Sequence, residues 1–337
     1  MTLDVRTSEY SLKGILSAPP KITDQLNAVC RTLELKIQKS KGLENILGEP
    51  VELWYNGKCW FYGFIFKRGY DSKGNVNYTA YDPLFIFKRH EDDFYFTNQT
   101  ATQGIRHLAK RAGVAVGSLQ DTGVVFNALY YPAAKADKVA IDMLTRTGQA
   151  NGKKYWLRFN PYTDDFGLKL FERKVPEEVW TFRAGVNLES AHYEESVEDM
   201  YNGIKLVNRE TGKTVLLIDQ ASKDKFGYRQ QFKEVDKDAV DTMDQRARQL
   251  LTNLSKVKAT MDITGVNPNR TMPQFFSGDY IYVEEEYTGM YGAYNLLDVS
   301  HTFLNDNLVD IAANIQRTPD MLAIQYDKAE TPPDYLK

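Results

Sequence analysis

The chain carries, from Gly48 to Asp82, the sequence GEPVELWYNGKCWFYGFIFKRGYDSKGNVNYTAYD. Two runs of β-branched and aromatic residues, Val51–Tyr55 and Cys59–Phe66, flank the pair Asn56-Gly57. An Asn-Gly pair between two such runs is a strong hairpin signal, because a type I′ turn needs a positive φ angle at both central residues. We therefore predict a tight β-hairpin centred on Asn56-Gly57.

The strand pattern continues beyond this hairpin. A second turn cluster at Asp71–Asn75 leads into Val76–Tyr81, where apolar and polar residues alternate. Alternation with a period of two is typical of a strand with one buried face. The whole stretch predicts a three-stranded antiparallel meander.

A related pattern recurs near the C-terminus. Gly48-Glu-Pro-Val51 is echoed by Gly278-Asp-Tyr-Ile281, and Tyr62-Gly63 is echoed by Tyr291-Gly292. These echoes predict two β modules with one pattern in a single chain. A glycine inside a strand marks a bulge or a close backbone approach, so we expect one or the other at Gly63 and at Gly292.

The composition limits the classes of protein. At 337 residues the chain is long enough for two or three domains with real cores. The net charge of −3 is spread along the chain without a basic tract, which argues against nucleic-acid binding through phosphate contacts. No apolar run could span a bilayer and the start lacks a signal-peptide pattern, so we expect folding in a cytosol.

Cys30 and Cys59 are predicted to be buried free thiols rather than a disulfide or metal pair.

The chain changes to a helical pattern in its middle part. Gly113 stands where a left-handed C-cap belongs, and a second helical pattern runs from Ala136 to Gly148. Two strands, Tyr155–Phe159 and Leu168–Glu172, follow. We predict an α/β insert domain at residues 96–185. The first helix is indicated by apolar residues three and four apart: Ile105, Leu108, Ala109 and Ala112.

The C-terminal half begins with strand-like segments at Asn202–Asn208 and Thr214–Ile218. The clearest helix follows at residues 236–254, with aspartates in its first turns, as the helix dipole favours. We assign residues 186–322 to the second β module, which includes this helix, and residues 323–337 to a tail. The apolar face of the helix is predicted to comprise Ala239, Val240, Met243, Ala247, Leu250, Leu251 and Leu254.

No catalytic constellation stands out. The segment before Thr214 contains the Gly-Lys-Thr of a phosphate-binding loop, but Val207 stands where that loop needs its first glycine, so Thr211-Gly212 predicts a hairpin turn. Asp236 and Asp241 lie in a pattern that lacks the glycine of a calcium loop and predict the acidic start of a helix. We therefore predict no catalytic, cofactor-binding or metal-binding residues.

Two further features have a plain structural explanation. His301 lies on an apolar strand face, which is typical of a core histidine with a satisfied ring rather than of a ligand. The carboxylate clusters Glu284-Glu285-Glu286 and Asp164-Asp165 would serve a glycosidase only if two carboxyl groups faced each other across a cleft. We predict that both clusters are acidic turns in solvent.

The hairpin carries aromatic residues on both faces. One apolar face can pack on its own core, whereas a second indicates cover by another domain or another subunit. This feature favours an assembly protein over a free-standing enzyme. The residues predicted to form an assembly interface come from both modules: Trp54, Tyr55, Trp60, Tyr62, Phe64, Tyr280, Tyr282 and Tyr291.

An ordered series of segments resembles the baseplate hub proteins of phage tails and tail-like particles, in the PBSX-type and late-control-D group. No single segment is specific, but the ordered set spans about residues 2 to 317. Glu49 departs from the family pattern, which usually has aspartate there. The segments that carry the resemblance are Arg31–Leu35, Gly48–Val51, Tyr62–Ile65, Ala80–Leu84, Thr100-Ala101, Gly113-Val114, Ser196–Asn202, Lys225–Gly227 and Tyr294–His301.

The resemblance implies an α+β, mainly β fold with two tube-like antiparallel β-barrel modules, residues 1–95 and 186–322, around the α/β insert. It implies a homotrimeric ring that joins a hexameric tail tube to a trimeric central spike. Val51–Leu53 and Ile281–Val283 would then occupy equivalent positions in two barrels about 60° apart.

The resemblance also implies the partners and the location. The expected partners are further copies of the chain, the tail tube protein or a tube initiator, the central spike protein, other baseplate proteins and the tape-measure protein. Neither a membrane nor a specific nucleic-acid sequence is expected as a partner, and no cofactor or catalytic residue is implied. The expected location is the tail baseplate of a virion or phage-like particle, assembled in the bacterial host cytoplasm.

Two other functions remain open. One is a hydrolase of the tail tip that acts on peptidoglycan or another glycan through paired carboxylates. The other is a host-surface module whose exposed aromatic residues stack on sugars. The doubled β pattern and the two-faced hairpin favour the structural hub over both.

Overall fold

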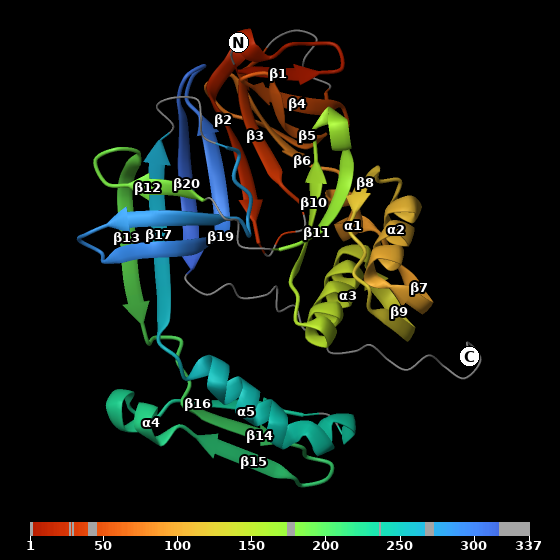
Figure 1. Ribbon diagram of the computed structural model, residues 1–337, viewed down its shortest axis with the longest axis vertical. Coiled ribbons are helices and arrows are strands. Elements are labelled where there is room, and N and C mark those ends of the chain that lie inside the picture. The colour runs from red at the N-terminus through yellow and green to blue at the C-terminus, as the bar shows by residue number, and fades with distance from the viewer. Residues whose placement is uncertain are drawn as a thin grey trace. The chain divides into compact units, whose positions relative to one another are not determined.

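The computed structural model divides the chain into two compact units (Figure 1): the first unit comprises Met1–Ala191 and Asp262–Lys337, and the second unit comprises His192–Met261. Strands predominate, so the fold is α+β and mainly β, as predicted. No helix in the described part of the chain is long and apolar enough to cross a bilayer. The predicted tail at residues 323–337 lies outside the described residues. The structure describes residues 3–26, 28, 30–39, 46–173, 179–235, 237–266 and 273–316.

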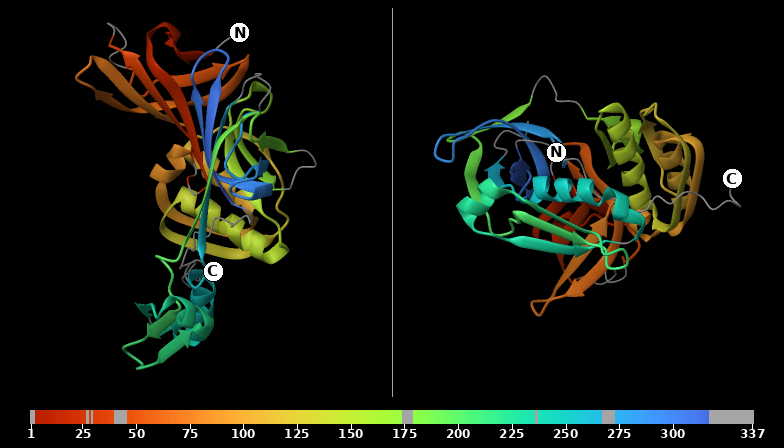
Figure 2. Two further views of the ribbon diagram at one scale, coloured as in Figure 1. Left: turned by 90° about the vertical axis from the view of Figure 1, so that its left-hand side faces the viewer. Right: turned by 90° about the horizontal axis from the view of Figure 1, so that it is seen from below.

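The first unit is built around a sheet with twelve described strands, which we divide into two sets of six. Hydrogen bonds join the two sets where β2 pairs with β19, and these strands lie side by side in Figures 1 and 2. The first set comprises β1 (Asp4–Thr7), β2 (Leu16–Gln25), β3 (Thr32–Gln38), β4 (Pro50–Tyr55), β5 (Lys58–Tyr70) and β6 (Asn75–Tyr81). The second set comprises β12 (Trp180–Arg183), β13 (Leu188–Ser196), β17 (Lys258–Val266), β18 (Tyr280–Glu285), β19 (Met290–Phe303) and β20 (Val309–Gln316).

The two sets have the same strand order. In each, the six strands counted along the chain lie in the sheet as first, fourth, fifth, sixth, third and second: β1-β4-β5-β6-β3-β2 and β12-β18-β19-β20-β17-β13. The first strand differs, because β1 joins β4 antiparallel whereas β12 joins β18 in parallel. Val51–Leu53 and Ile281–Val283 therefore hold equivalent places in the strand order, but within one hydrogen-bonded sheet.

The fourth and fifth strands of the two sets also match in register. Gly48 donates its N–H to the Ile65 carbonyl (2.8 Å), and Gly278 donates to the Leu296 carbonyl (2.7 Å). Both glycines lie in the left-handed region, with φ angles of 86° and 89°, which glycine adopts without steric cost. A register shift follows directly after Ile65 in β5 and directly after Leu296 in β19. The echo between Gly48 and Gly278 is therefore a structural equivalence.

The predicted hairpin is confirmed. Asn56 and Gly57 have φ angles of 51° and 79°, as a type I′ turn requires, and Tyr55 pairs with Lys58 across the turn. The close approach expected at Gly63 is confirmed as well, because a Cβ atom there would lie 2.3 Å from the Tyr81 carbonyl oxygen.

The expectation for Gly292 is wrong. A Cβ atom at Gly292 would meet nothing within 4 Å, and the pairing of β18 with β19 runs through it without a register shift. Gly63 pairs with Val51, whereas Ile281, the counterpart of Val51, pairs with Tyr294. The Tyr-Gly echo is therefore out of step by two residues, because a short dipeptide match does not fix strand register.

An insert of helices and small sheets lies between the two sets. Thr100 and Gln103 form a capping box at the start of α2, and Gly113 (φ 68°) ends α2 as predicted. Helix α3 continues to Asn151, past the predicted end at Gly148. Strands β10 and β11 pair as predicted, whereas the long pair β7 and β9 was not anticipated. The elements are α1 (Phe85–Arg89), β7 (Glu91–Thr100), α2 (Ala101–Ala112), β8 (Val116–Leu119), β9 (Val125–Lys135), α3 (Ala136–Asn151), β10 (Tyr155–Asn160) and β11 (Gly167–Glu172).

The second unit is a three-stranded sheet with helix α5 packed on it, as Figure 2 shows. The predicted turn at Thr211-Gly212 is confirmed by the antiparallel pairing of β14 with β15. The single helix predicted at 236–254 is wrong in its first part: Lys237–Thr242 forms a 3₁₀ turn, because valine, aspartate and threonine are poor helix formers. Asp236 lies outside the described residues. The elements are β14 (Gly203–Val207), β15 (Thr214–Ile218), α4 (Gln220–Phe226), β16 (Gln230–Glu234) and α5 (Met243–Leu254).

Candidate assembly interface and its buried support

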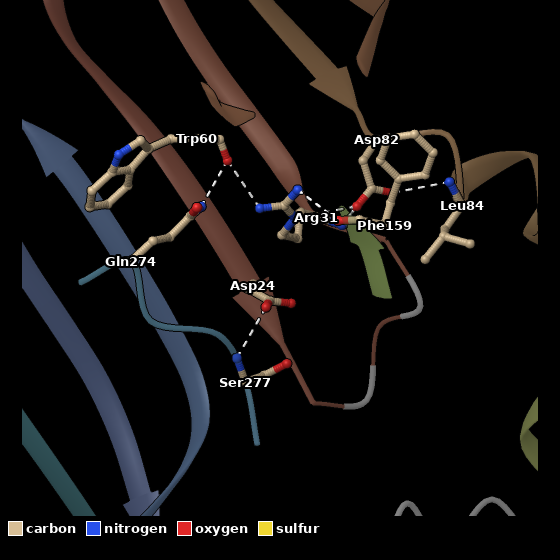
Figure 3. A network of polar contacts seen from close by, with 8 residues as sticks. All are labelled: Asp24, Arg31, Trp60, Asp82, Leu84, Phe159, Gln274 and Ser277. Carbon is tan, nitrogen blue, oxygen red and sulfur yellow. Dashed lines mark hydrogen bonds and ion pairs between the residues drawn. The ribbon is translucent and has the colours of Figure 1, made fainter. Parts of the chain in front are cut away.

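A buried ion pair joins two segments that the sequence places far apart. Asp82 follows β6, and Arg31 precedes β3; both side chains are almost fully buried. The Arg31 backbone N–H donates to Asp82 Oδ2 (3.0 Å), and the guanidinium Nε lies 3.5 Å from the same oxygen (Figure 3). Asp82 Oδ1 accepts the Leu84 N–H (3.1 Å) at the turn into α1. Two segments of the resemblance thus meet in space.

The Arg31 guanidinium connects three parts of the first unit. It donates to the Trp60 carbonyl of β5 (3.1 Å) and to the Phe159 carbonyl of β10 (3.2 Å). Gln274, in the segment before β18, donates to the same Trp60 carbonyl (2.7 Å), as Figure 3 shows. The network therefore ties the first set, the insert and the segment that leads into β18 to one buried cation.

Burial sets the protonation of this region. The pKa of Asp82 is raised to about 6 because burial disfavours its charged form, and the Arg31 charge opposes this shift. Burial also raises the pKa of Asp24, whose carboxylate accepts the Ser277 N–H (3.0 Å). A buried polar network of this kind is costly to break, because each group left behind would be desolvated without a partner.

The second aromatic face of β5 is covered by the chain's own insert. Tyr62 stacks on Phe159 with ring centroids 6.0 Å apart and meets Phe166 edge-on at 5.0 Å. Phe66 lies 4.6 Å from Phe85 of α1, centroid to centroid. Another part of the same chain therefore accounts for much of the cover that the aromatic pattern requires.

The structure divides the eight predicted interface residues into different environments. Tyr55 and Trp60 are buried and pack edge-on against each other, with centroids 5.6 Å apart, so these two side chains belong to the core and are unavailable to a partner. Trp54 lies under the Arg6 guanidinium (5.6 Å) and Tyr280 under that of Arg173 (4.4 Å). The rest are exposed or half-buried: Tyr62, Phe64, Tyr282 and Tyr291.

The histidine and the two cysteines named in the sequence analysis are all buried in the structure. His301 is buried, and its Nε2 accepts the Phe275 N–H (3.3 Å), so the prediction of a satisfied core histidine is confirmed. Burial lowers its pKa to about 3. Cys30 and Cys59 are buried free thiols, as predicted, and burial raises the pKa of each to about 12. No group of three or more metal-ligating side chains occurs among the described residues.

The sequence reasoning assigned no role to Arg31 and Asp82, although both stand in segments that carry the resemblance. The available signal was their position: each charged residue stands directly at the end of a strand with one buried face, and a charged side chain buried there needs a partner. Sequence separation hid the pairing, since the two residues are 51 positions apart.

Comparisons with known proteins agree with the architecture. The model of the YQBQ-like family matches residues 21–310. Two relatives come from Bacillus subtilis (strain 168). The uncharacterized protein YqbQ is 25% identical over 311 residues, 89% of each chain. The phage-like element PBSX protein XkdQ is 27% identical over 264 residues, 76% of this chain and 78% of its own.

A solved structure shares the fold. The 43 kDa tail protein of prophage MuSo2 from Shewanella oneidensis aligns with a TM-score of 0.67 at 14% identity, over 94% of this chain and 98% of that chain. Because the family model matches residues 21–310, which is most of the 337 residues, the chain belongs to the YQBQ-like family.

Proposed function

We propose that this chain is a structural baseplate hub of a phage or phage-like contractile tail, a homotrimeric ring that joins the hexameric tail tube to the trimeric central spike. Family membership, and a relative named as a protein of the phage-like element PBSX, support a structural role in a tail or tail-like particle. The observation that carries the finer proposal is the strand order that occurs twice in one chain.

The doubled strand order would allow a ring of three subunits to bind a tube of six-fold symmetry. A ring of three identical subunits presents each surface three times, whereas a six-fold tube needs six similar surfaces. Three chains with two equivalent sets of strands supply six. In this proposal the first and the second set of strands form the two ring modules, about 60° apart around the axis. The insert from α1 to β11 lies outside the ring, where it receives other baseplate proteins.

The proposal predicts the stoichiometry of the particle. An image of the assembled tail should show three copies of this chain in one ring, between the tube and the spike. The purified chain can be monomeric, because tube and spike complete the ring contacts from above and below. Six copies in the ring would contradict the proposal.

The carboxylates singled out for a hydrolase hold local structure instead, although Glu285 is buried and not in solvent as predicted. Glu285 accepts the N–H groups of Tyr287 (3.0 Å) and Thr288 (2.7 Å), and hydrogen bonding by the Thr288 side chain lowers its pKa. Asp165 accepts hydrogen bonds from Ser118 and pairs with Lys169, which lowers its pKa. A general acid of a glycosidase needs a raised pKa. These hydrogen bonds and lowered pKa values support a structural role for the carboxylate clusters at Glu284-Glu285-Glu286 and Asp164-Asp165.

We accordingly expect no lytic activity. The purified chain should leave cell walls undigested in a zymogram at acid and at neutral pH, with a lysozyme lane as the positive control. Clear lysis that disappears in Glu285→Gln would overturn the purely structural function.

A further inference from the structure

One junction inside the chain shows how two sets of strands bind each other. β2, the second strand of the first set, pairs antiparallel with β19, the fifth strand of the second set, from Asp298↔Gln25 to Thr302↔Lys21. The Leu26 N–H also donates to the Leu297 carbonyl (2.7 Å). The second strand of one set thus pairs with the open half of the fifth strand of the other set. We call this half open because no described strand of its own set pairs with that edge.

The counterpart of this open half lies in β5. Because Ile65 matches Leu296 and a register shift follows each, Lys67–Tyr70 corresponds to Asp298–His301. In β19 these residues have β20 on one edge and β2 on the other. In β5 they have β6 on one edge, and no described strand of the chain occupies the other.

The counterpart of β2 is β13, which ends the sheet on the opposite side. Its one neighbouring strand in the described chain is β17, apart from a single bridge between Leu188 and Ala184. The free edge of β13 is therefore the counterpart of the β2 edge in the junction. The free edge of Lys67–Tyr70 in β5 is the counterpart of the β19 edge.

We propose that β13 of one copy pairs antiparallel with Lys67–Tyr70 of β5 in the next copy, and so repeats between chains the β2–β19 junction found within the chain. Strand edges readily accept a further strand through main-chain hydrogen bonds. A head-to-tail contact closes into a ring of three when each copy is rotated by a third of a turn relative to the last. This inference rests on the hub function proposed above and names the surface through which its subunits meet.

Side chains of the two edges are complementary. The β5 edge carries the cations Lys67 and Arg68 between two exposed aromatic residues, Phe66 (45% exposed) and Tyr70 (56%). The β13 edge carries the exposed carboxylate Glu189. Opposite charges steer the correct edges together. Lysine and arginine on an edge strand also discourage pairing of β5 with a second β5, which leaves the acidic strand as the matching occupant.

The test uses pairs of engineered cysteines in the full chain. Lys67 and Gly69 correspond to Asp298 and Ser300, which line one shallow depression with Thr264. The Ser190 hydroxyl lies 2.7 Å from that of Thr264, so Ser190 is on the same face. We therefore combine Ser190→Cys with Lys67→Cys or with Gly69→Cys. A side chain at position 69 meets nothing within 4 Å, and the native thiols are buried.

Oxidation of assembled tail particles should give a disulfide-linked species of three chains in at least one of the two pairs. The matched control is Arg68→Cys with Ser190→Cys, which lies on the same edge with its side chain on the opposite face, and it should stay unlinked. The single variants should also stay unlinked.

The outcomes separate this inference from the hub function. Three copies per ring in the particle without any cross-link in either pair would overturn the strand pairing and leave the hub intact. Covalent ladders that extend beyond three chains would support the pairing and overturn the closed ring of three. Equal cross-linking in the Arg68 control would also overturn the proposed pairing, because it would not depend on the face of the strand.

Discussion

Replacing Asp82 with alanine should lower the free energy of unfolding by about 3–5 kcal/mol, because the Arg31 charge would remain buried without its carboxylate. The substitution also removes the acceptor for the N–H of Leu84 at the turn into α1. The measurement is denaturant unfolding followed by tryptophan fluorescence. All four tryptophans of the chain lie in the first unit, so their signal reports the unit that contains the network.

The matched control is an ion pair in solvent. Lys13 lies 3.2 Å from Asp306 with both side chains exposed, and Lys13→Ala should cost less than about 1 kcal/mol. The double variant Arg31→Leu, Asp82→Ala should lose less than the two single losses added together, because neither member of the ion pair is left without the other. A loss in Asp82→Ala no greater than in Lys13→Ala would show that the network does not support the first unit.

Acid should destabilise the first unit through His301. The folded pKa of about 3 lies below the ordinary value of 6.5, so the unfolded chain binds the proton first as pH falls. Between pH 6.5 and 3 this histidine therefore costs about 1.4 kcal/mol for each pH unit. The physical cause is burial, reinforced by the Arg31 charge. Protonation of Nε2 would also remove the acceptor of the Phe275 N–H.

Asp82 acts in the opposite direction over part of this range. Its folded pKa of about 6 lies above the ordinary 3.8, so the folded chain binds the proton first, and this group lowers stability as pH rises from 3.8 to 6. The contribution of His301 is therefore best measured as a difference between two proteins that share Asp82.

His301→Gln supplies that difference, since glutamine keeps an acceptor but does not titrate. The unfolding free energy of the wild type should fall relative to the variant by about 1.4 kcal/mol per pH unit below pH 6. His192→Gln, at an exposed histidine of β13, controls for the loss of an imidazole. Parallel curves for the wild type and His301→Gln would contradict the buried neutral ring.

The sequence predicted best those features that depend on neighbouring residues. The Asn56-Gly57 turn, the end of α2 at Gly113 and the alternation of the strands follow from local sterics and periodicity. The match of Gly48 with Gly278 was also visible, because both positions need a positive φ angle.

What the sequence hid depends on contacts between distant segments. The insert covers the second face of β5 through Phe159 and Phe166, roughly a hundred residues away, and no local pattern encodes that packing. The pairing of Arg31 with Asp82 was missed for the same reason. The 3₁₀ turn before α5 was not predicted, because the apolar residues in this segment are spaced as in a helix. The low helix propensity of its residue types was the opposing signal.

One strand connection has very different lengths in the two sets. In the first set the second and third strands are joined by residues 26–31, whereas in the second set residues 197–257 stand between them. If the two sets descend from one duplicated ancestor, this connection is where one copy acquired an extra folded unit while the order of its strands was retained. Lineages of the family would then diverge in length at this joint, and a foreign domain grafted there would be tolerated better than one placed in the connection of the first set at residues 26–31.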